Sequence, residues 1–426
     1  MGRTNNNDAP RPHLPPIEKI ELSNDHKMWR LAAVIFLMLF GAAALVYALV
    51  GFMSADAGWQ RIEASSSAET NCSGDFVLLY NIGAGDTSAN AEMKALTSAY
   101  TNAAIRAYQL YSADEGFDGV HNVYYINRHP NEAVEVDSAL YQAFSLVQRH
   151  ENRSLYLAPV YCVFNNIFYC DTDAELADFD PLLNDGLRAD FAVMAAYGRD
   201  CACVDLRLLG DDRVMLYVSD EYLAYAEAEG IEDFIDFYWM KNAFIVDYLA
   251  EALILEGYTF GAISSYDGFV RNLDNVSESD YSFNIFDRAE QSGRVAAVME
   301  YTGRRSIVLL RDFPLNSRDY QHYYRLSNGE TRTAYLDPAD GLSKSALPAL
   351  AGYSSNLGCA EILLRLVPIY IAERFDEAAV AALTEDDLYS VYCRDGTVCY
   401  NDPSLVLSQL YAGEDMTYSA SYTGPK

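Results

Sequence analysis

Residues suited to chemistry gather in two segments of this 426-residue chain. Residues 236–247 read Asp-Phe-Tyr-Trp-Met-Lys-Asn-Ala-Phe-Ile-Val-Asp and run into a stretch with helical periodicity. Residues 316–341 begin with Asn-Ser-Arg-Asp-Tyr and end in Asp-Pro-Ala-Asp-Gly, which predicts a tight turn. Aromatic rings can stack on a planar ligand, carboxylates can bind a hard metal ion, and histidine can accept a proton near neutral pH. Both segments therefore carry side chains that are suited to chemistry.

Both helices and strands are expected to position these two segments. Helical and strand patterns alternate irregularly from residue 75 onward, which favours an α+β fold. No Gly-x-Gly-x-x-Gly follows a predicted strand, which argues against a doubly wound dinucleotide fold. The expected helices are residues 91–111, 138–150, 220–229, 246–256 and 359–375, and the expected strands are residues 76–82, 260–264, 294–301 and 306–310.

An apolar segment near the N-terminus predicts a membrane anchor. Residues 31–53 carry no charge, and as a helix they are long enough to cross a bilayer. The run exceeds the apolar part of a cleaved signal peptide, and the basic residues before it predict a cytoplasmic N-terminus. We expect a single-pass protein of the cell membrane. Its parts are a disordered cytoplasmic tail (1–30), the transmembrane helix (31–53), an extracytoplasmic tether (54–74) and one extracytoplasmic domain (75–426).

The charge balance limits the partners. The chain has 61 Asp and Glu against 30 Lys and Arg, a net charge of −31. This charge excludes a nucleic-acid partner, because like charges repel. An anionic cofactor would need a local site that offsets this negative charge, such as the backbone N–H groups at a helix start.

The eight cysteines are consistent with an oxidising compartment. Cys162 and Cys170 flank one predicted three-residue hairpin turn, and Cys393 and Cys399 flank another. Opposed strand positions bring Cβ atoms close enough for a disulfide. Each pair is predicted either as a disulfide or as two buried thiols.

In order and spacing, the two chemical segments resemble the ApbE family of FAD:protein FMN transferases, and the resemblance extends over about residues 75–410. The family has Gly-Gly-Ile-Ala-Lys-Gly before Val-Asp and a helix. Its two glycines fall on Tyr238 and Trp239, its Lys falls on Asn242, and Asp247 keeps its place. Bulky side chains at glycine positions block close backbone approach. Tyr238 and Trp239 are therefore expected either to stack on a flavin or to fill its former space.

The resemblance also implies which residues bind FAD, the expected cofactor. Asp267 stands in the family's glycine turn, here Tyr-Asp-Gly, and Asp337 stands in the retained Asp-Pro turn. The implied cofactor-binding residues are Tyr238, Trp239, Asn242, Asp267 and Asp337.

The implied catalytic and metal residues depart further from the family. Ser317 and Asp319 keep the family's types, but its histidine falls on Ala334, and His322 is the nearby substitute as proton acceptor. The implied catalytic residues are His322, Asp319 and Ser317. Glu361 replaces the Asp that holds Mg²⁺, and Arg365, one helical turn later, is the hypothetical replacement for the metal's charge.

Three functions remain open. The first is a membrane-anchored transferase that moves FMN from FAD to a Ser or Thr of an extracytoplasmic acceptor protein with Mg²⁺. The second is a pseudoenzyme that binds a flavin, a nucleotide, or a protein such as a redox partner. The third is an unrelated surface interaction module, to which the 33 tyrosines are suited. Whether the chain is an enzyme stays open, and the replaced Gly-Gly, Lys, His and metal Asp argue against catalysis.

Overall fold

The computed structural model describes residues 28, 32, 35–38, 57–65, 72–84, 88–273, 280–289, 292–315, 319, 322–413 and 416–424. The chain divides into two units, residues 1–55 and 56–426. In the first unit the described residues are helical and exposed. Within the part of the chain that the structure describes, no helix combines the length and the apolar character needed to cross a bilayer. Most of the predicted anchor, residues 31–53, lies outside the described residues.

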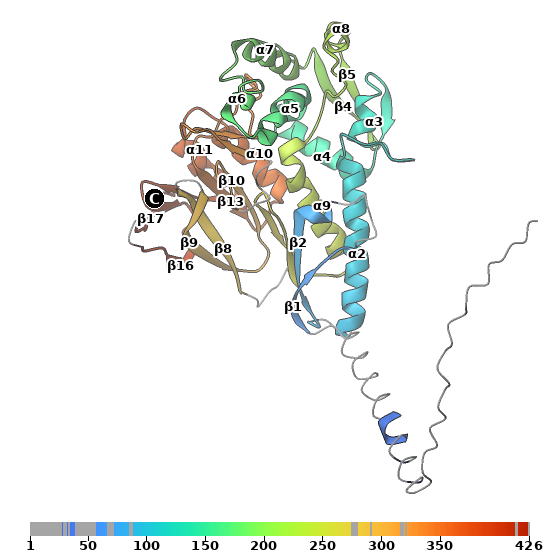
Figure 1. Ribbon diagram of the computed structural model, residues 1–426, viewed down its shortest axis with the longest axis vertical. Coiled ribbons are helices and arrows are strands. Elements are labelled where there is room, and N and C mark those ends of the chain that lie inside the picture. The colour runs from blue at the N-terminus through green and yellow to red at the C-terminus, as the bar shows by residue number, and fades with distance from the viewer. Residues whose placement is uncertain are drawn as a thin grey trace, which may run out of the picture. The chain divides into compact units, whose positions relative to one another are not determined.

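The second unit is built on a mixed sheet, which has nine strands among the described residues (Figure 1). Neighbouring strands are antiparallel except for the last pair, β15 and β17, which is parallel. In spatial order the strands are β1 (Gly58–Ile62), β2 (Phe76–Ile82), β6 (Gly261–Ser265), β7 (Phe269–Asn272), β10 (Ser306–Arg311), β13 (Ala349–Ser354), β14 (Tyr389–Arg394), β15 (Thr397–Tyr400) and β17 (Ser419–Tyr422). Gly58–Ile62 thus belong to the sheet rather than to a tether, because β1 pairs with β2 at the edge.

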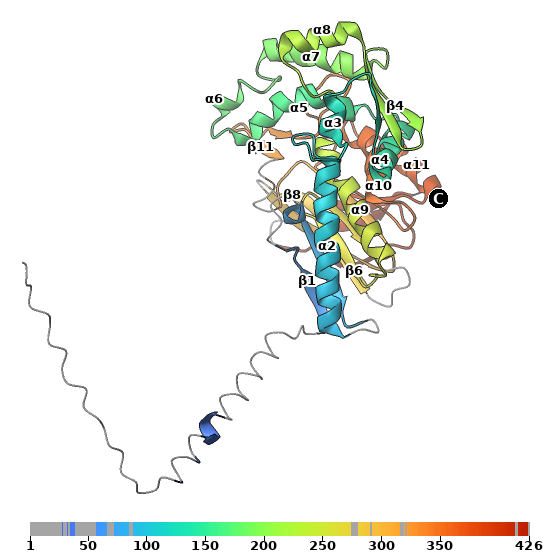
Figure 2. The same cartoon turned by 90° about the vertical axis from the view of Figure 1, so that its right-hand side faces the viewer.

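Both faces of the sheet are covered. Helices α9 (Lys241–Leu255) and α10 (Cys359–Tyr370) pack on one face, and α2 (Ala89–Tyr111) runs beside α9 in both views (Figures 1 and 2). A second sheet of β16 (Val406–Leu410), β9 (Ser292–Thr302) and β8 (Asp280–Ala289) covers the other face. Strands β10 and β13 are buried at every residue, as expected for central strands between two layers.

A mainly helical region lies beyond the ends of α2 and α9 (Figure 2). Its helices are α3 (Val123–Asn127), α4 (Ser138–Arg149), α5 (Ala158–Phe164), α6 (Asp173–Leu176), α7 (Asp185–Arg199) and α8 (Asp220–Glu229), with the 3₁₀ turns η2 (Ser154–Leu157) and η3 (Asn165–Tyr169). Its small sheet is β3 (Ala133–Glu135), β5 (Arg213–Val218) and β4 (Val204–Gly210). The remaining elements are η1 (Ser73–Asp75), η4 (Tyr238–Met240), the hairpin β11 (Tyr323–Arg325) and β12 (Thr331–Thr333), α11 (Glu377–Ala382) and η6 (Leu383–Asp386).

The α+β prediction is confirmed, with shifted boundaries. Helix α9 begins at Lys241, five residues before the predicted start, and α10 ends at Tyr370, two residues after Pro368.

The predicted cysteine hairpins are wrong in geometry. Cys162 lies in helix α5, and Cys170 follows η3, so no hairpin joins them. The β14–β15 hairpin has a two-residue turn, Asp395–Gly396, with both residues at positive φ. This shorter turn shifts the register by one residue, so that Cys393 faces Val398 and Cys399 faces Tyr392. All eight cysteines are free thiols in the structure.

Candidate functional site

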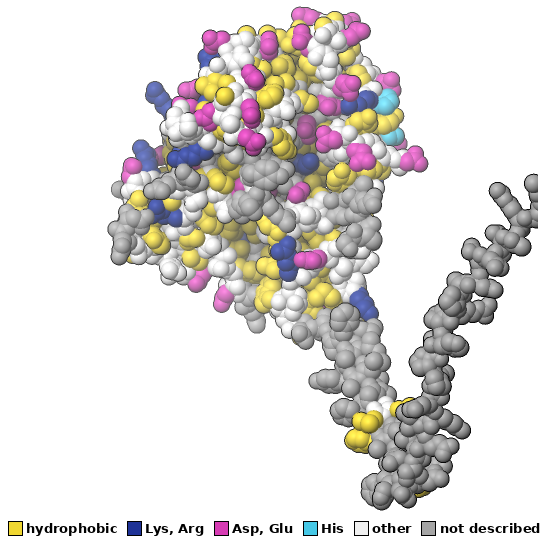
Figure 3. All heavy atoms as spheres, in the orientation of Figure 1, with side chains coloured by type: hydrophobic (Ala, Val, Ile, Leu, Met, Phe, Trp, Pro, Cys, Tyr) yellow, Lys and Arg dark blue, Asp and Glu magenta, His cyan; other side chains and the backbone are white. Residues whose placement is uncertain are grey.

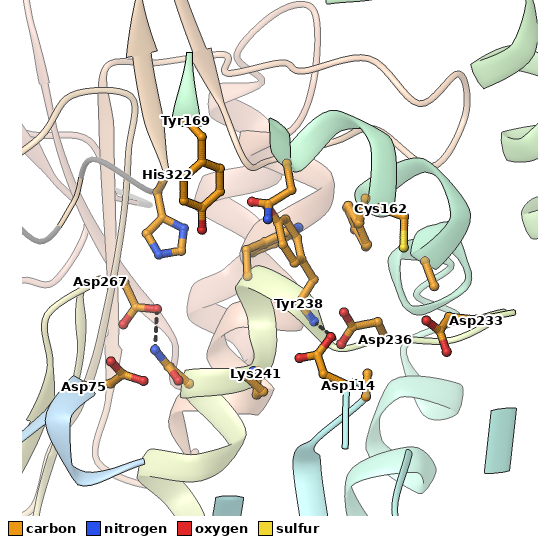
Figure 4. Close-up of a pocket in the computed structure, with 16 residues that line it drawn as sticks. Asp75, Asp114, Cys162, Tyr169, Asp233, Asp236, Tyr238, Lys241, Asp267 and His322 are labelled. Carbon is orange, nitrogen blue, oxygen red and sulfur yellow. Dashed lines mark hydrogen bonds between the residues drawn. The ribbon is translucent and has the colours of Figure 1, made fainter. Parts of the chain in front are cut away.

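A pocket of about 500 Å³ opens where the helical region meets the large sheet (Figure 4). Its walls come from segments far apart in the chain: η1, the loop after α2, helix α5 with η3, the loop leading into η4 and α9, the β6–β7 turn, and the residue before β11. The lining residues are Asp75, Ala113, Asp114, Ala158, Tyr161, Cys162, Asn165, Tyr169, Asp233, Asp236, Tyr238, Trp239, Lys241, Asn242, Asp267 and His322.

One buried amide fixes the loop before η4. The side chain of Asn127, at the end of α3, accepts the N–H groups of Phe234 and Ile235 at 3.1 Å each and donates to the Ile235 carbonyl at 2.9 Å. Phe237 packs its ring against the rings of Tyr111 and Phe144. The hydrogen bonds of Asn127 and the ring contacts of Phe237 therefore fix the backbone that leads into η4.

Tyr238 has a backbone conformation that glycine adopts more easily. Its φ is +43°, in the left-handed region, which costs a residue with a Cβ about 1 to 2 kcal/mol. The ring stacks on Tyr161 with centroids 4.4 Å apart, and the hydroxyl donates to Oδ1 of Asn165 at 2.6 Å. The position that resembles a family glycine thus keeps a glycine-like backbone, and the tyrosine is held in it by packing.

Trp239 lies deeper than Tyr238. Its side chain is 4% exposed, and its ring meets Tyr335 edge to face with centroids 4.9 Å apart. Both aromatic residues border the pocket, and neither closes it. The pocket thus stays open beside both rings, and Trp239 also belongs to the core.

Asn242 and Asp267, both predicted from the resemblance, meet across the pocket floor. The Asn242 amide donates to Oδ2 of Asp267 at 3.0 Å (Figure 4). Oδ1 of each side chain is buried, and no hydrogen-bond donor within the described residues reaches it. The turn requires Gly268, because its φ is +114° and a Cβ would lie 2.5 Å from the Leu309 carbonyl oxygen.

A buried ion pair supports the wall formed by Asp267 and His322. Arg311 and Asp319 are almost fully buried, with Nη2 2.9 Å from Oδ1. Arg311 also donates to the carbonyls of Tyr266 and Asp267 at 3.3 and 3.0 Å. The Asp319 carbonyl accepts the His322 N–H at 2.9 Å. Asp319 was predicted as catalytic, but the structure places it in the core as the partner of Arg311, outside the pocket lining.

Of the other two predicted catalytic residues, His322 borders the pocket and Ser317 lies outside the described residues. Tyr323 pairs with Thr333 in the β11–β12 hairpin, and the Ala334 N–H donates to the His322 carbonyl at 3.2 Å. His322 therefore lies directly across from Ala334, the position of the family's histidine. Opposed residues in an antiparallel pair project on the same side.

Asp337 and Glu361 do not line the pocket. The Asp337 carboxylate pairs with Lys344 at 2.7 Å, and the Asp337 carbonyl closes the turn by accepting the Gly341 N–H at 2.7 Å. The Glu361 carboxylate pairs with Arg365 at 3.0 Å, as the helical spacing predicts, and Arg365 also pairs with Asp386. Among the described residues, no three His, Cys, Asp or Glu side chains converge on a point where they could hold a metal ion.

Lys241 and four of the acidic lining residues were not predicted from the sequence. Lys241 lies one position before Asn242 and borders both this pocket and a neighbouring one of about 110 Å³. Asp114 and Asp236 join it from two separate loops. Burial raises the pKa of Asp236 to about 6, against the opposing charge of Lys241. The sequence signal for Lys241 was its place one residue before Asn242, on which the family's lysine falls.

The arrangement of the elements defines the fold class. No family model matches the chain, and no curated protein matches it. Solved structures do match. This chain has the fold of the ApbE flavin transferases.

Two of the structures similar to it are the ApbE protein of Thermotoga maritima and the flavin transferase ApbE of Vibrio cholerae. The first has a TM-score of 0.54 and 13% identity, covering 79% of this chain and 94% of that one. The second has a TM-score of 0.50 and 12% identity, covering 79% of this chain and 93% of that one.

Proposed function

We propose that this chain binds a small ligand in the pocket bordered by Tyr238, Asn242 and Asp267, and that it does not transfer FMN from FAD. The observation that carries this proposal is the composition of the pocket walls. The pocket has the size of a small-molecule site, but carboxylates outnumber cations around it. Four of the five residues implied for cofactor binding border it, and the implied metal residue does not.

The starts of η4 and α10 are poorly suited to a pyrophosphate. Backbone N–H groups at a helix start are the usual anion site. At the start of η4, Oδ1 of Asp236 accepts the Tyr238 N–H at 2.9 Å. At the start of α10, the Asp247 carboxylate accepts the N–H groups of Cys359 and Ala360 at 2.9 Å each. Carboxylates of the chain itself thus take the positions that phosphate oxygens would need.

The side chains implied for Mg²⁺ do not fit that ion either. Mg²⁺ requires oxygen ligands with free lone pairs in tight octahedral geometry. The Glu361 carboxylate instead faces the guanidinium of Arg365, which supports the hypothesis that Arg365 replaces the metal's charge. The residues present therefore do not fit FAD with Mg²⁺.

Titration calorimetry and an AMP assay test the proposal. Full-length chain is titrated with FAD, alone and with MgCl₂, and incubated with FAD and a protein that offers a Ser or Thr acceptor. We expect no magnesium-dependent FAD binding and no AMP release. Catalytic release of AMP, with FMN attached to the acceptor, would overturn the proposal.

A second candidate, active FMN transfer, is favoured by one observation. Lys241 and His322 both border the pocket, next to the positions where the family has Lys and His. If transfer occurs, Lys241→Met and His322→Gln should each reduce AMP release at least tenfold, because each removes a charge or a proton acceptor.

The cellular setting is also a proposal. The apolar run 31–53 and the basic residues before it support a single-pass anchor with residues 56–426 outside the cytoplasm, where a protein acceptor or redox partner would be met. Protease added to intact cells should digest the large domain and spare the N-terminal tail. Protection of the large domain would contradict this orientation.

A further inference from the structure

We propose that the pocket binds a small organic cation that carries two or more amine groups, such as a linear polyamine. This inference rests on the proposed function, since it names the ligand class of the same pocket.

The charges around the pocket favour a cation. Five aspartates border it, and the carboxylate of one, Asp233, is paired with Arg128. Lys241 brings an ammonium to the same lining. The whole chain is also strongly acidic, and Figure 3 shows acidic side chains spread over the described surface of one face. An anion entering this pocket would meet repulsion, whereas a cation would be attracted.

The carboxylates form two groups rather than one. Asp75 and Asp267 lie on one side of the pocket, and Asp114, Asp233 and Asp236 lie on the other (Figure 4). The first two come from segments in contact, because the Tyr266 N–H donates to the Asp75 carbonyl at 3.1 Å. Two separated groups of negative charge match a chain with an ammonium at each end better than a single point charge.

Aromatic side chains also line the pocket. Tyr238 and Tyr161 are stacked, Trp239 lies beside them, and Tyr169 is exposed at the rim. Faces of such rings attract ammonium and alkylammonium groups, and the attraction strengthens where water is excluded. The methylene chain of a polyamine would also bury apolar surface against these rings.

Two of the three buried lining atoms that lack a partner within the described residues are acceptors, and the third, Nε1 of Trp239, is a donor. Oδ1 of Asn242 and Oδ1 of Asp267 are buried and face no donor within the described residues. A buried acceptor without a donor costs about 1 to 3 kcal/mol. An ammonium group carries three donors and no acceptor, so it can satisfy both oxygens, whereas a phosphate has only acceptors to offer.

Calorimetry with chosen probes tests this proposal. Full-length chain at low salt is titrated with spermidine, with putrescine and with octanediol, a neutral chain of comparable length. We expect one spermidine per chain, bound more tightly than putrescine, and no binding of octanediol. The double variant Asp236→Asn, Asp267→Asn should bind spermidine at least tenfold more weakly, because two carboxylates lose their charge while the side-chain shape is kept.

Two further variants separate the pocket from the general acidity of the chain. Asp185→Asn removes one negative charge from a fully exposed position on α7 and should leave spermidine affinity unchanged. Lys241→Met removes the cation from the pocket and should strengthen spermidine binding severalfold, whereas a site for FAD would weaken in the same variant. Thermal unfolding of each variant confirms that it is folded.

The outcomes distinguish the two proposals. Equal weakening by Asp185→Asn and by the pocket variants, binding of octanediol, or weaker spermidine binding in Lys241→Met would overturn the cation proposal. If AMP is also not released from FAD, the proposed function still stands. Release of AMP would overturn the proposed function, and the cation proposal with it.

Discussion

Removal of Arg311 should destabilise the domain more than any exposed charge change. Arg311 is fully buried, and Arg311→Met would remove the guanidinium that lies 2.9 Å from the Asp319 carboxylate, which is 1% exposed. The Tyr266 and Asp267 carbonyls would each lose a donor. Breaking a buried ion pair from one side costs about 3 to 5 kcal/mol, and each unpaired carbonyl adds about 1 kcal/mol. We expect the free energy of unfolding to fall by about 5 kcal/mol.

Urea unfolding of a double-mutant cycle measures this effect. The cycle comprises Arg311→Met, Asp319→Leu and the double variant, in which both charges of this ion pair are removed. We expect the double variant to be at least about 2 kcal/mol more stable than the sum of the single effects implies. The matched control is Arg394→Met, because Arg394 pairs with Glu377 where both side chains are more than half exposed, and its effect should stay within about 1 kcal/mol. Additive single effects, or a loss of stability no larger than in the control, would refute the reasoning.

Three further predictions concern the pocket and the elements beside it. The Asp236 pKa of about 6 lies above its ordinary value of 3.8, so the folded chain holds more protons than the unfolded chain between these pH values, and stability should fall as pH rises through this window. Asp236→Asn should flatten that slope by up to about 3 kcal/mol in unfolding experiments at pH 4 and pH 7, and an unchanged slope would contradict the assignment. Asp247→Ala removes the cap of α10 and the Arg271 partner at 2.8 Å, so we expect urea unfolding to show a loss of about 2 to 4 kcal/mol; a loss below about 1 kcal/mol would mean that the cap is dispensable. Gly268→Ala should cost more than about 2 kcal/mol, measured as a lower melting temperature, because the new Cβ meets a carbonyl oxygen and φ is positive; an unaltered melting temperature would speak against this turn geometry.

Features that depend on neighbouring residues could be predicted from the sequence, whereas contacts between distant segments could not. Helices and strands were largely predictable, because the periodicity of apolar residues is written along each segment. The cysteine pairings were not, since one residue fewer in the Asp395–Gly396 turn moves Cys399 from facing Cys393 to facing Tyr392. The pairing of Glu361 with Arg365 was predictable, because helical spacing alone puts residues four apart on one face.

The pocket residues likewise divide into those that the sequence indicated and those that only the structure placed. Tyr238, Trp239, Asn242, Asp267 and His322 could be named in advance, because the order of the chemical segments pointed to them. The ion pair of Asp319 with Arg311 was not predictable, because Arg311 ends β10 and no sequence pattern joins the two residues.

The sequence by itself determined the acidic balance, the apolar run at 31–53, the α+β class and the two segments that border the site. These properties depend on composition and on neighbours within a few residues. Only the tertiary structure decided which charges face one another, because the aspartates of the pocket come from four separate segments. Electrostatic interactions depend on distance in space rather than on separation along the chain, so the character of the pocket emerges only when the chain folds.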